Sequence, residues 1–196
     1  VKADGSGEIH NLTNSGYSEG SPQWVLDGKA MIFQSDRAGY RSHGSWGAES
    51  DAYIMFFDQE AYDRFRMSKE EIALTDEKKI KDLKFDLSDL EYRTIRLTPY
   101  STNLGSTVLS KDGTKLYYIA PHAGSPALWM QDLKEYRNEL KMPGIGWGSL
   151  DVDDDIKYAY LASGGAIQKL DIENGRLSDI AFEAFYTDRP QELRAY

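Results

Sequence analysis

The chain has 196 residues, of which 40% are hydrophobic and 12% aromatic, enough apolar material to build a folded core. Thirty-two acidic side chains against 23 basic ones give a formal charge of −9, which argues against nucleic acid and anionic membranes as partners. There is no cysteine, which excludes disulfides, thiolate nucleophiles and cysteine-ligated metals, and no apolar run approaches the roughly 20 residues of a membrane helix.

The strands are expected in groups of four, taken in chain order. Residues 8–12 resemble the last strand of a unit that starts earlier. The first full group is predicted at 23–26, 30–35, 52–57 and 92–97, the second at 106–109, 115–120, 127–132 and 136–140, and the third at 148–152, 157–162, 166–171 and 177–185. An Asp-Gly pair between alternating apolar runs, as at Asp27-Gly28 and Asp112-Gly113, is typical of a hairpin turn, since both turn positions favour positive φ.

A repeat runs through these groups. Leu12-Thr13 precedes Asp27-Gly28 by 15 residues, and Leu97-Thr98 precedes Asp112-Gly113 by the same distance. A weaker third copy is expected at 154–157, about 42 residues after Asp112, which is an ordinary length for one blade of a β-propeller. The first interval is about twice as long, so it contains either a degenerate blade or an insertion. The helix-like run 67–74 and the lysine-rich stretch after it favour an insertion.

The sequence therefore predicts an all-β fold: a partial β-propeller of about three four-stranded antiparallel blades, with a polar, partly helical insertion around 58–90. The expected organisation is a blade end at 1–13, blades at 14–98, 99–141 and 142–188, and the start of a linker at 189–196. The chain begins without Met and ends shortly after a predicted strand, so a fragment of a longer protein is expected. Eight aromatic residues in or beside the strands are expected to form the core rather than a ligand platform: Trp24, Phe33, Tyr53, Tyr118, Trp129, Trp147, Tyr160 and Phe182.

The repeat motif points to a family. Leu12-Thr13, Ser21-Pro22-Gln23-Trp24, Asp27-Gly28-Lys29, Ser35-Asp36-Arg37 and Asp51-Ala52-Tyr53 together resemble the propeller repeat of TolB-like and tricorn-protease-like proteins. The match is strong in the first blade, partial in the second around Asp112-Gly113, and weak in the third. Val25-Leu26 stands where the family usually has Ser-Pro.

The insertion and the tail 192–196 resemble tricorn-like members of the tail-specific serine protease family. The resemblance implies a parent peptidase in which a PDZ-like and a catalytic domain follow the propeller. It also implies a periplasmic or extracytoplasmic location, with the cytoplasm as the alternative. This chain would then have no catalytic residues and no cofactor of its own, and would screen or guide peptides.

Candidate sites in the sequence are few. His10, His43 and His122 fit no compact metal motif, and a triad of Ser45, His43 and Asp51 lacks a nucleophile-elbow motif. The acidic run 151–155 lacks the glycine and distal glutamate of a calcium loop, so a solvated turn and no metal site are expected.

Two segments carry positive expectations. Ser35-Asp36-Arg37 is expected to act structurally, with the aspartate bonding backbone amides of the turn that follows and the arginine reaching a neighbouring carboxylate. The long loop 40–50 is the candidate binding surface, because Tyr40, Arg41, His43 and Trp46 are of types found at interaction sites. An irregular surface loop, or a contact to other domains, is the alternative.

Three functions remain open from the sequence: a peptide-handling module of a tricorn-like peptidase, a TolB-like scaffold that docks proteins without a protease, and the propeller of a prolyl-oligopeptidase-type enzyme. In all three, the partners would be peptides, proteins or the remaining blades. Three blades also leave two sheet faces uncovered, so self-association is expected unless other parts of a larger protein cover them.

Overall fold

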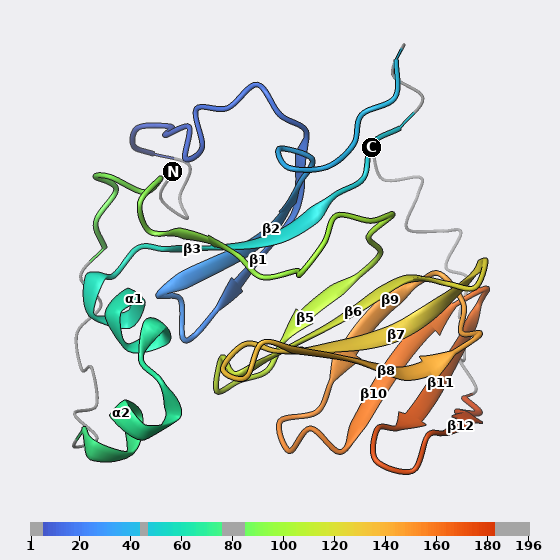
Figure 1. Cartoon of the computed structure of the whole chain (residues 1–196). Helices are drawn as coiled ribbons and strands as arrows, with labels where there is room; N and C mark the ends of the chain where they lie inside the picture. The colour runs from blue at the N-terminus through green and yellow to red at the C-terminus, as the bar shows by residue number, and fades with distance from the viewer. Residues whose placement is uncertain (1–5, 44–46, 76–84, 183–196) are drawn as a thin grey trace, which may run out of the picture.

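The computed structural model describes residues 6–43, 47–75 and 85–182. Three four-stranded antiparallel sheets stand side by side, and in each of them strands that follow one another in sequence are neighbours (Figure 1). The first sheet contains β1 (Glu19–Val25), β2 (Ala30–Ser35), β3 (Asp51–Phe56) and β4 (Thr94–Arg96). The second contains β5 (Thr107–Leu109), β6 (Lys115–His122), β7 (Ser125–Asp132) and β8 (Arg137–Pro143). The third contains β9 (Ser149–Val152), β10 (Tyr158–Ser163), β11 (Ala166–Asp171) and β12 (Arg176–Asp179).

Apolar side chains that alternate along the strands form the contacts between the sheets. Ile32 and Ile54 of the first sheet pack with Leu116 and Tyr118 of the second in one buried cluster. The opposite face of the second sheet packs on the third through a cluster that contains Tyr117, Ile119, Leu128, Leu150, Leu161 and Leu170. The second sheet is thus apolar on both faces, as a blade between two neighbours must be. The mainly β fold of three propeller-like blades that the sequence predicts is confirmed.

The far face of the first sheet has its own apolar cover. Phe33, Tyr53 and Met55 point away from the second sheet and form a third cluster with Phe57 and Leu90. Leu12 from the N-terminal segment and Leu87 from the insertion pack against this cluster. Part of the face that was expected to be open is therefore covered by the chain itself.

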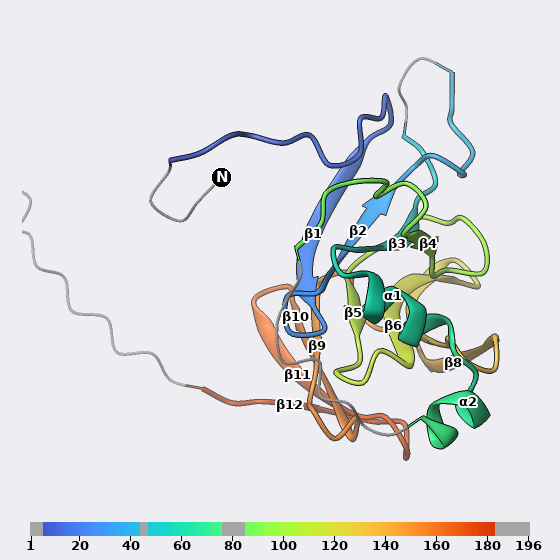
Figure 2. The ribbon, with the colours of Figure 1, turned by 90° about the vertical axis from the view of Figure 1, so that its left-hand side faces the viewer.

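The insertion begins with two short helices. Helix α1 (Gln59–Arg66) starts at Asp58, whose carboxylate accepts a hydrogen bond from the Ala61 amide at 2.9 Å. Helix α2 (Lys69–Leu74) starts at Ser68 with a reciprocal capping box to Glu71. The helices lie beside the hairpin turns at one end of the first two sheets (Figures 1 and 2). The predicted helix within 67–74 is present, and 76–84 lies outside the described residues.

Two lysine side chains hold the helices to the second sheet, one through hydrogen bonds and one through an ion pair. The Lys134 ammonium, in the turn between β7 and β8, donates to the carbonyl oxygens of Phe65 and Met67 at the end of α1. Lys69 of α2 forms an ion pair with Glu135 of the same turn. The insertion leaves the first sheet but is fastened to the second, so it connects the two blades.

Several predicted details are wrong. Residues 8–12 are not a strand in the structure, and β4 spans only Thr94–Arg96. The last strand, predicted at 177–185, ends at Asp179, and residues 183–185 of that prediction lie outside the described residues. The strand predicted at 23–26 begins earlier, at Glu19, with an irregular register between Gly20 and Gln23. Trp24, Trp147 and Phe182 are exposed rather than core, whereas Phe33, Tyr53 and Tyr118 are buried as predicted and Trp129 and Tyr160 are half-buried.

Both Asp-Gly hairpins are present; Asp27 and Gly28 both have positive φ as predicted, whereas the second hairpin differs from the predicted pattern. Around Asp112-Gly113 only Gly113 has positive φ, at +72°, and the Asp112 carboxylate accepts a hydrogen bond from the Thr114 amide at 3.0 Å. Around Asp27-Gly28 three consecutive residues from Leu26 to Gly28 have positive φ. In the third sheet Ile156 occupies the place of Gly113, which shifts the predicted repeat by one residue.

Candidate functional site

The long connection between β2 and β3 extends beyond the sheets at the end opposite the helices (Figures 1 and 2). Its two arms pair briefly: the Glu49 amide donates to the Tyr40 carbonyl at 2.9 Å, and the Ser42 amide donates to the Gly47 carbonyl at 3.2 Å. Gly39 lies so close to the other arm that a Cβ there would come within 1.9 Å of the Glu49 carbonyl oxygen. A side chain at position 39 would therefore push the arms apart.

Asp36 anchors the base of this loop. Its side chain is nearly buried, forms an ion pair with Arg41, and accepts a hydrogen bond from the Ser18 amide at 3.0 Å. Burial alone would raise the pKa of Asp36, but the hydrogen bonds from Arg41 and Ser18 outweigh it and lower the pKa below its ordinary value. Asp36 is therefore a charged anchor at neutral pH.

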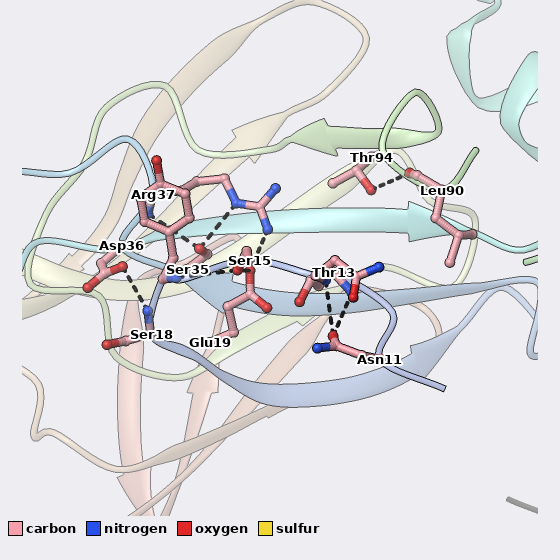
Figure 3. A network of polar contacts seen from close by, with 12 residues as sticks. Asn11, Thr13, Ser15, Ser18, Glu19, Ser35, Asp36, Arg37, Leu90 and Thr94 are labelled. Carbon is pink, nitrogen blue, oxygen red and sulfur yellow. Dashed lines mark hydrogen bonds and ion pairs between the residues drawn. The ribbon is translucent and has the colours of Figure 1, made fainter. Parts of the chain in front are cut away.

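Arg37 points to the other side of the strand end, into the polar network of Figure 3. Its guanidinium lies 4.9 Å from the ring centre of Tyr53 and 5.6 Å from that of Phe33, donates to Ser35 Oγ at 3.2 Å, and forms an ion pair with Glu19. Burial would raise the pKa of Glu19, but hydrogen bonds from Thr13, Ser15 and Arg37 lower it. The arrangement ties the start of β1 to the end of β2.

The arms of the loop and the base enclose a cleft of about 650 Å³. Asp36, Arg41, Ser18, Tyr40, Ser42 and His43 line it, together with Gly47 and Ala48. The Arg41 guanidinium also stacks over the Tyr17 ring, 4.7 Å from its centre, which restricts where its charge can move. Tyr40 is 73% exposed. The cleft thus presents the restrained guanidinium of Arg41, the exposed ring of Tyr40 and the imidazole of His43.

The structure brings three of the four predicted site residues, Tyr40, Arg41 and His43, to this one cleft. The fourth, Trp46, lies outside the described residues. Sequence reasoning missed Tyr17 and Ser18, which come from the segment before β1. The sequence predicts that Asp36 bonds backbone amides of the turn after it, and this is wrong: its carboxylate accepts a hydrogen bond from the Ser18 amide, 18 residues earlier in the chain. No local pattern therefore indicates Tyr17 or Ser18.

The other repeat-motif residues lie away from this cleft. Asp27, Gly28, Asp112 and Gly113 form the hairpin turns at the opposite end of the sheets. Trp24 is 57% exposed, and its ring lies 5.1 Å from that of Phe57 on the far face of the first sheet.

The remaining candidates have structural surroundings. The His122 ring lies 5.6 Å from the Trp129 ring, and Asp51 is bonded to Arg96, Thr98 and Ser101 rather than to His43. In the acidic run, the Asp153 carboxylate accepts hydrogen bonds from the Lys157 and Tyr158 amides, which closes the turn. Within 6–43, 47–75 and 85–182, no three His, Asp or Glu residues are placed to hold a metal ion, and no helix is long and apolar enough to cross a membrane.

No protein-family model matches the chain, and no curated protein matches its sequence. Solved structures do. The tricorn protease superimposes with a TM-score of 0.56 at 12% identity over 87% of this chain, and TolB from Acinetobacter baumannii with 0.52 at 18% identity over 88%. An oligogalacturonate lyase from Vibrio parahaemolyticus gives 0.51 at 14% identity over 86%.

The chain spans only part of each of these proteins: 18% of the tricorn protease chain, 34% of TolB and 42% of the lyase. At such identities the likeness concerns the fold alone. The neighbours include the tricorn protease and TolB, the proteins whose propeller repeat the sequence motif resembles. The matched part of this chain, 86–88% of it, is built mainly of its three four-stranded sheets. The chain therefore has the fold of a β-propeller module related in architecture to those of the tricorn protease and TolB.

Proposed function

We propose that this chain is a non-catalytic β-propeller module that binds peptides or a protein partner in the cleft of the β2–β3 loop. The proposal rests on the position of Arg41. Its guanidinium is fixed by an ion pair with Asp36 and a cation–π contact with Tyr17, in the same cleft as the exposed ring of Tyr40. Arginine and tyrosine are both among the residue types enriched at the energetic centres of protein interfaces. The chain as a whole is acidic, so this local arrangement differs from the average surface.

We further propose that the module belongs to a tricorn-like serine peptidase, where it screens or guides peptides in a periplasmic or other extracytoplasmic compartment. The repeat motif and the likeness to the tricorn protease fold support this assignment. The coding sequence after Tyr196 tests it. A PDZ-like domain followed by a catalytic domain would support the peptidase, whereas a stop codon would contradict it and favour a docking scaffold.

Binding is tested separately from parentage. An array of overlapping 12-residue peptides from casein, used as an unfolded protein, provides the probes, and the strongest is then measured by titration calorimetry. Tyr40→Ala is expected to weaken binding about tenfold, equivalent to about 1.4 kcal/mol. Tyr92→Ala is the matched control, because Tyr92 is similarly exposed, at 77%, but precedes β4 at the other end of the blade.

Equal loss in the two variants, or no binding of any peptide, would refute the cleft as the binding site. The same preparation incubated with casein is expected to release no fragments. Hydrolysis that survives further purification would contradict the non-catalytic role.

A further inference from the structure

A second cleft, of about 410 Å³, is lined in part by residues of the insertion's helices. These helices lie at the opposite end of the sheets from the β2–β3 loop (Figures 1 and 2). Three hairpin turns contribute to the cleft: the one between β1 and β2, the one between β5 and β6, and, through Lys134, the one between β7 and β8. Its size falls within the range of small-ligand sites. It shares no residue with the β2–β3 loop cleft.

The cleft has apolar walls. Leu26, Ala61, Phe65 and Ile72 supply them from the first hairpin turn, α1 and α2. Leu26 has φ of +52°, a conformation that is costly for a residue with a side chain, and it brings its side chain next to Gly113. A Cβ at Gly113 would lie 3.1 Å from Leu26 Cδ2 and 3.8 Å from Phe65 Cδ2, so these side chains stand directly over that glycine.

Four cations and two carboxylates surround this apolar surface: Lys29, Arg64, Lys111, Lys134, Asp27 and Asp112. Three of these groups are already engaged. Lys111 pairs with Asp154, the Lys134 ammonium donates to two carbonyls of the α1 end, and both oxygens of Asp112 accept hydrogen bonds from its own turn.

Lys29 and Arg64 differ from the others. Both are half-buried, and the described part of the chain contains no ion pair to either of them. A cation that is partly removed from water beside apolar side chains is unfavourable unless an anion compensates it. Asp27, the remaining carboxylate of the cleft, is exposed and balances at most one of the two charges.

We propose that this cleft binds a small carboxylate that carries an apolar group, with the carboxylate on Arg64 and Lys29 and the apolar group on Leu26, Phe65 and Ile72. Arg64 can receive a carboxylate with two parallel N–H donors, and the Lys134 ammonium has a third hydrogen beyond the two carbonyls it serves. Two sources offer this chemistry: the C-terminal residue of a peptide and a short-chain fatty acid. The site is independent of the β2–β3 loop cleft and does not rest on the function proposed for it.

Titration calorimetry with three probes tests the proposal: acetyl-glycyl-leucine, the same peptide with a C-terminal amide, and octanoate. The carboxylate form of the peptide, octanoate or both are expected to bind, and the amide at least about tenfold more weakly, because it lacks the charge. Binding of the peptide acid alone assigns the site to peptide C-termini, and binding of octanoate alone assigns it to fatty acids.

The variants Arg64→Gln and Lys29→Gln are each expected to weaken binding of the carboxylate about tenfold. Arg66→Gln is the matched control, since Arg66 lies on the same helix, is exposed and does not line this cleft. The variant Tyr40→Ala should leave this binding unchanged, which separates the two sites.

The proposal is overturned if neither carboxylate binds, if acid and amide bind equally, or if Arg66→Gln weakens binding as much as Arg64→Gln. Circular dichroism of each variant establishes that the fold is retained, so that a loss of binding is read as a loss of the site.

Discussion

Asp51 is a fully buried carboxylate, and replacing it tests how the first sheet holds its loops. It accepts hydrogen bonds from Arg96 Nε at 2.9 Å, from Thr98 Oγ1 at 2.7 Å and from Ser101 Oγ at 2.7 Å, and pairs with a second Arg96 nitrogen at 2.7 Å. These contacts tie the start of β3 to the end of β4 and to the segment after it.

The expected cost follows from what each partner can do afterwards. In Asp51→Ala the buried hydroxyl of Thr98 loses its acceptor, whereas Arg96, whose side chain is 36% exposed, can be solvated by water. A buried ion pair that loses one partner costs roughly 3–5 kcal/mol, so about 3 kcal/mol is expected here, at the low end because Arg96 reaches water. Asp51→Asn keeps a carbonyl acceptor and should cost about 1–2 kcal/mol.

Urea unfolding followed by circular dichroism measures both variants, and an unchanged slope shows that the two-state analysis holds. Hydrogen exchange adds a local readout. The amides of Ser50 and Thr102, which bond reciprocally beside Asp51 at 2.7 and 3.1 Å, should exchange faster. A loss below about 1 kcal/mol for Asp51→Ala, or a larger loss for Asp51→Asn, would refute the reasoning.

Three further predictions concern the turns and the core. Tyr136 is 87% exposed, has φ of +55°, and occupies the turn position at which the next blade has Gly175. Because positive φ is unfavourable for a residue with a side chain, Tyr136→Gly should raise the free energy of unfolding in urea by about 1 kcal/mol. Tyr136→Ala keeps the unfavourable backbone conformation and should not stabilise the protein. Burial raises the pKa of Tyr117 to about 12 and raises that of Tyr118, so above pH 10 the unfolded chain loses protons that the folded chain keeps. The free energy of unfolding should then fall by about 1.4 kcal/mol per pH unit for each tyrosine. A fall that begins only beyond pH 12 would contradict this. Lys134→Met removes the ammonium that bonds the last carbonyls of α1. Hydrogen exchange measured by mass spectrometry should become faster in that helix while the rest of the protein exchanges as before. Equally faster exchange throughout the protein would argue against local anchoring.

Much of the fold could be predicted from local patterns. Alternation in segments such as 30–35 and 115–120 identifies β2 and most of β6, because the side-chain period of a strand assigns every second residue to the same face. The Asp-Gly pairs locate two hairpins, and the Ser-x-x-Glu pattern at Ser68 marks the start of α2. Tyr40, Arg41 and His43 are neighbours in sequence, so a loop was enough to bring them together.

Other features depended on tertiary contacts. Trp24 lies on the far face of the first sheet, which Leu12 of the N-terminal segment and Leu87 of the insertion cover only in part, and its side chain stays 57% exposed. Positive φ at Tyr136 and Ile156 is imposed by hairpin closure against residue preference. No local sequence pattern indicates the exposure of Trp24 or the positive φ at these two residues, because each depends on what packs around the residue.

The second cleft shows most clearly which features depend on local sequence and which depend on tertiary contacts. Helix propensity and capping place Arg64 on a short helix, and hairpin chemistry places Lys29 beside a turn. Both residues line one cleft with Leu26 and Phe65 because the helices of the insertion are fastened to the second blade by Lys134 and Lys69. The sequence by itself determined strands, turns and helix ends, since these depend on neighbours within a few residues. The tertiary structure alone decided which charges share an apolar cleft, since that depends on contacts between residues more than thirty positions apart.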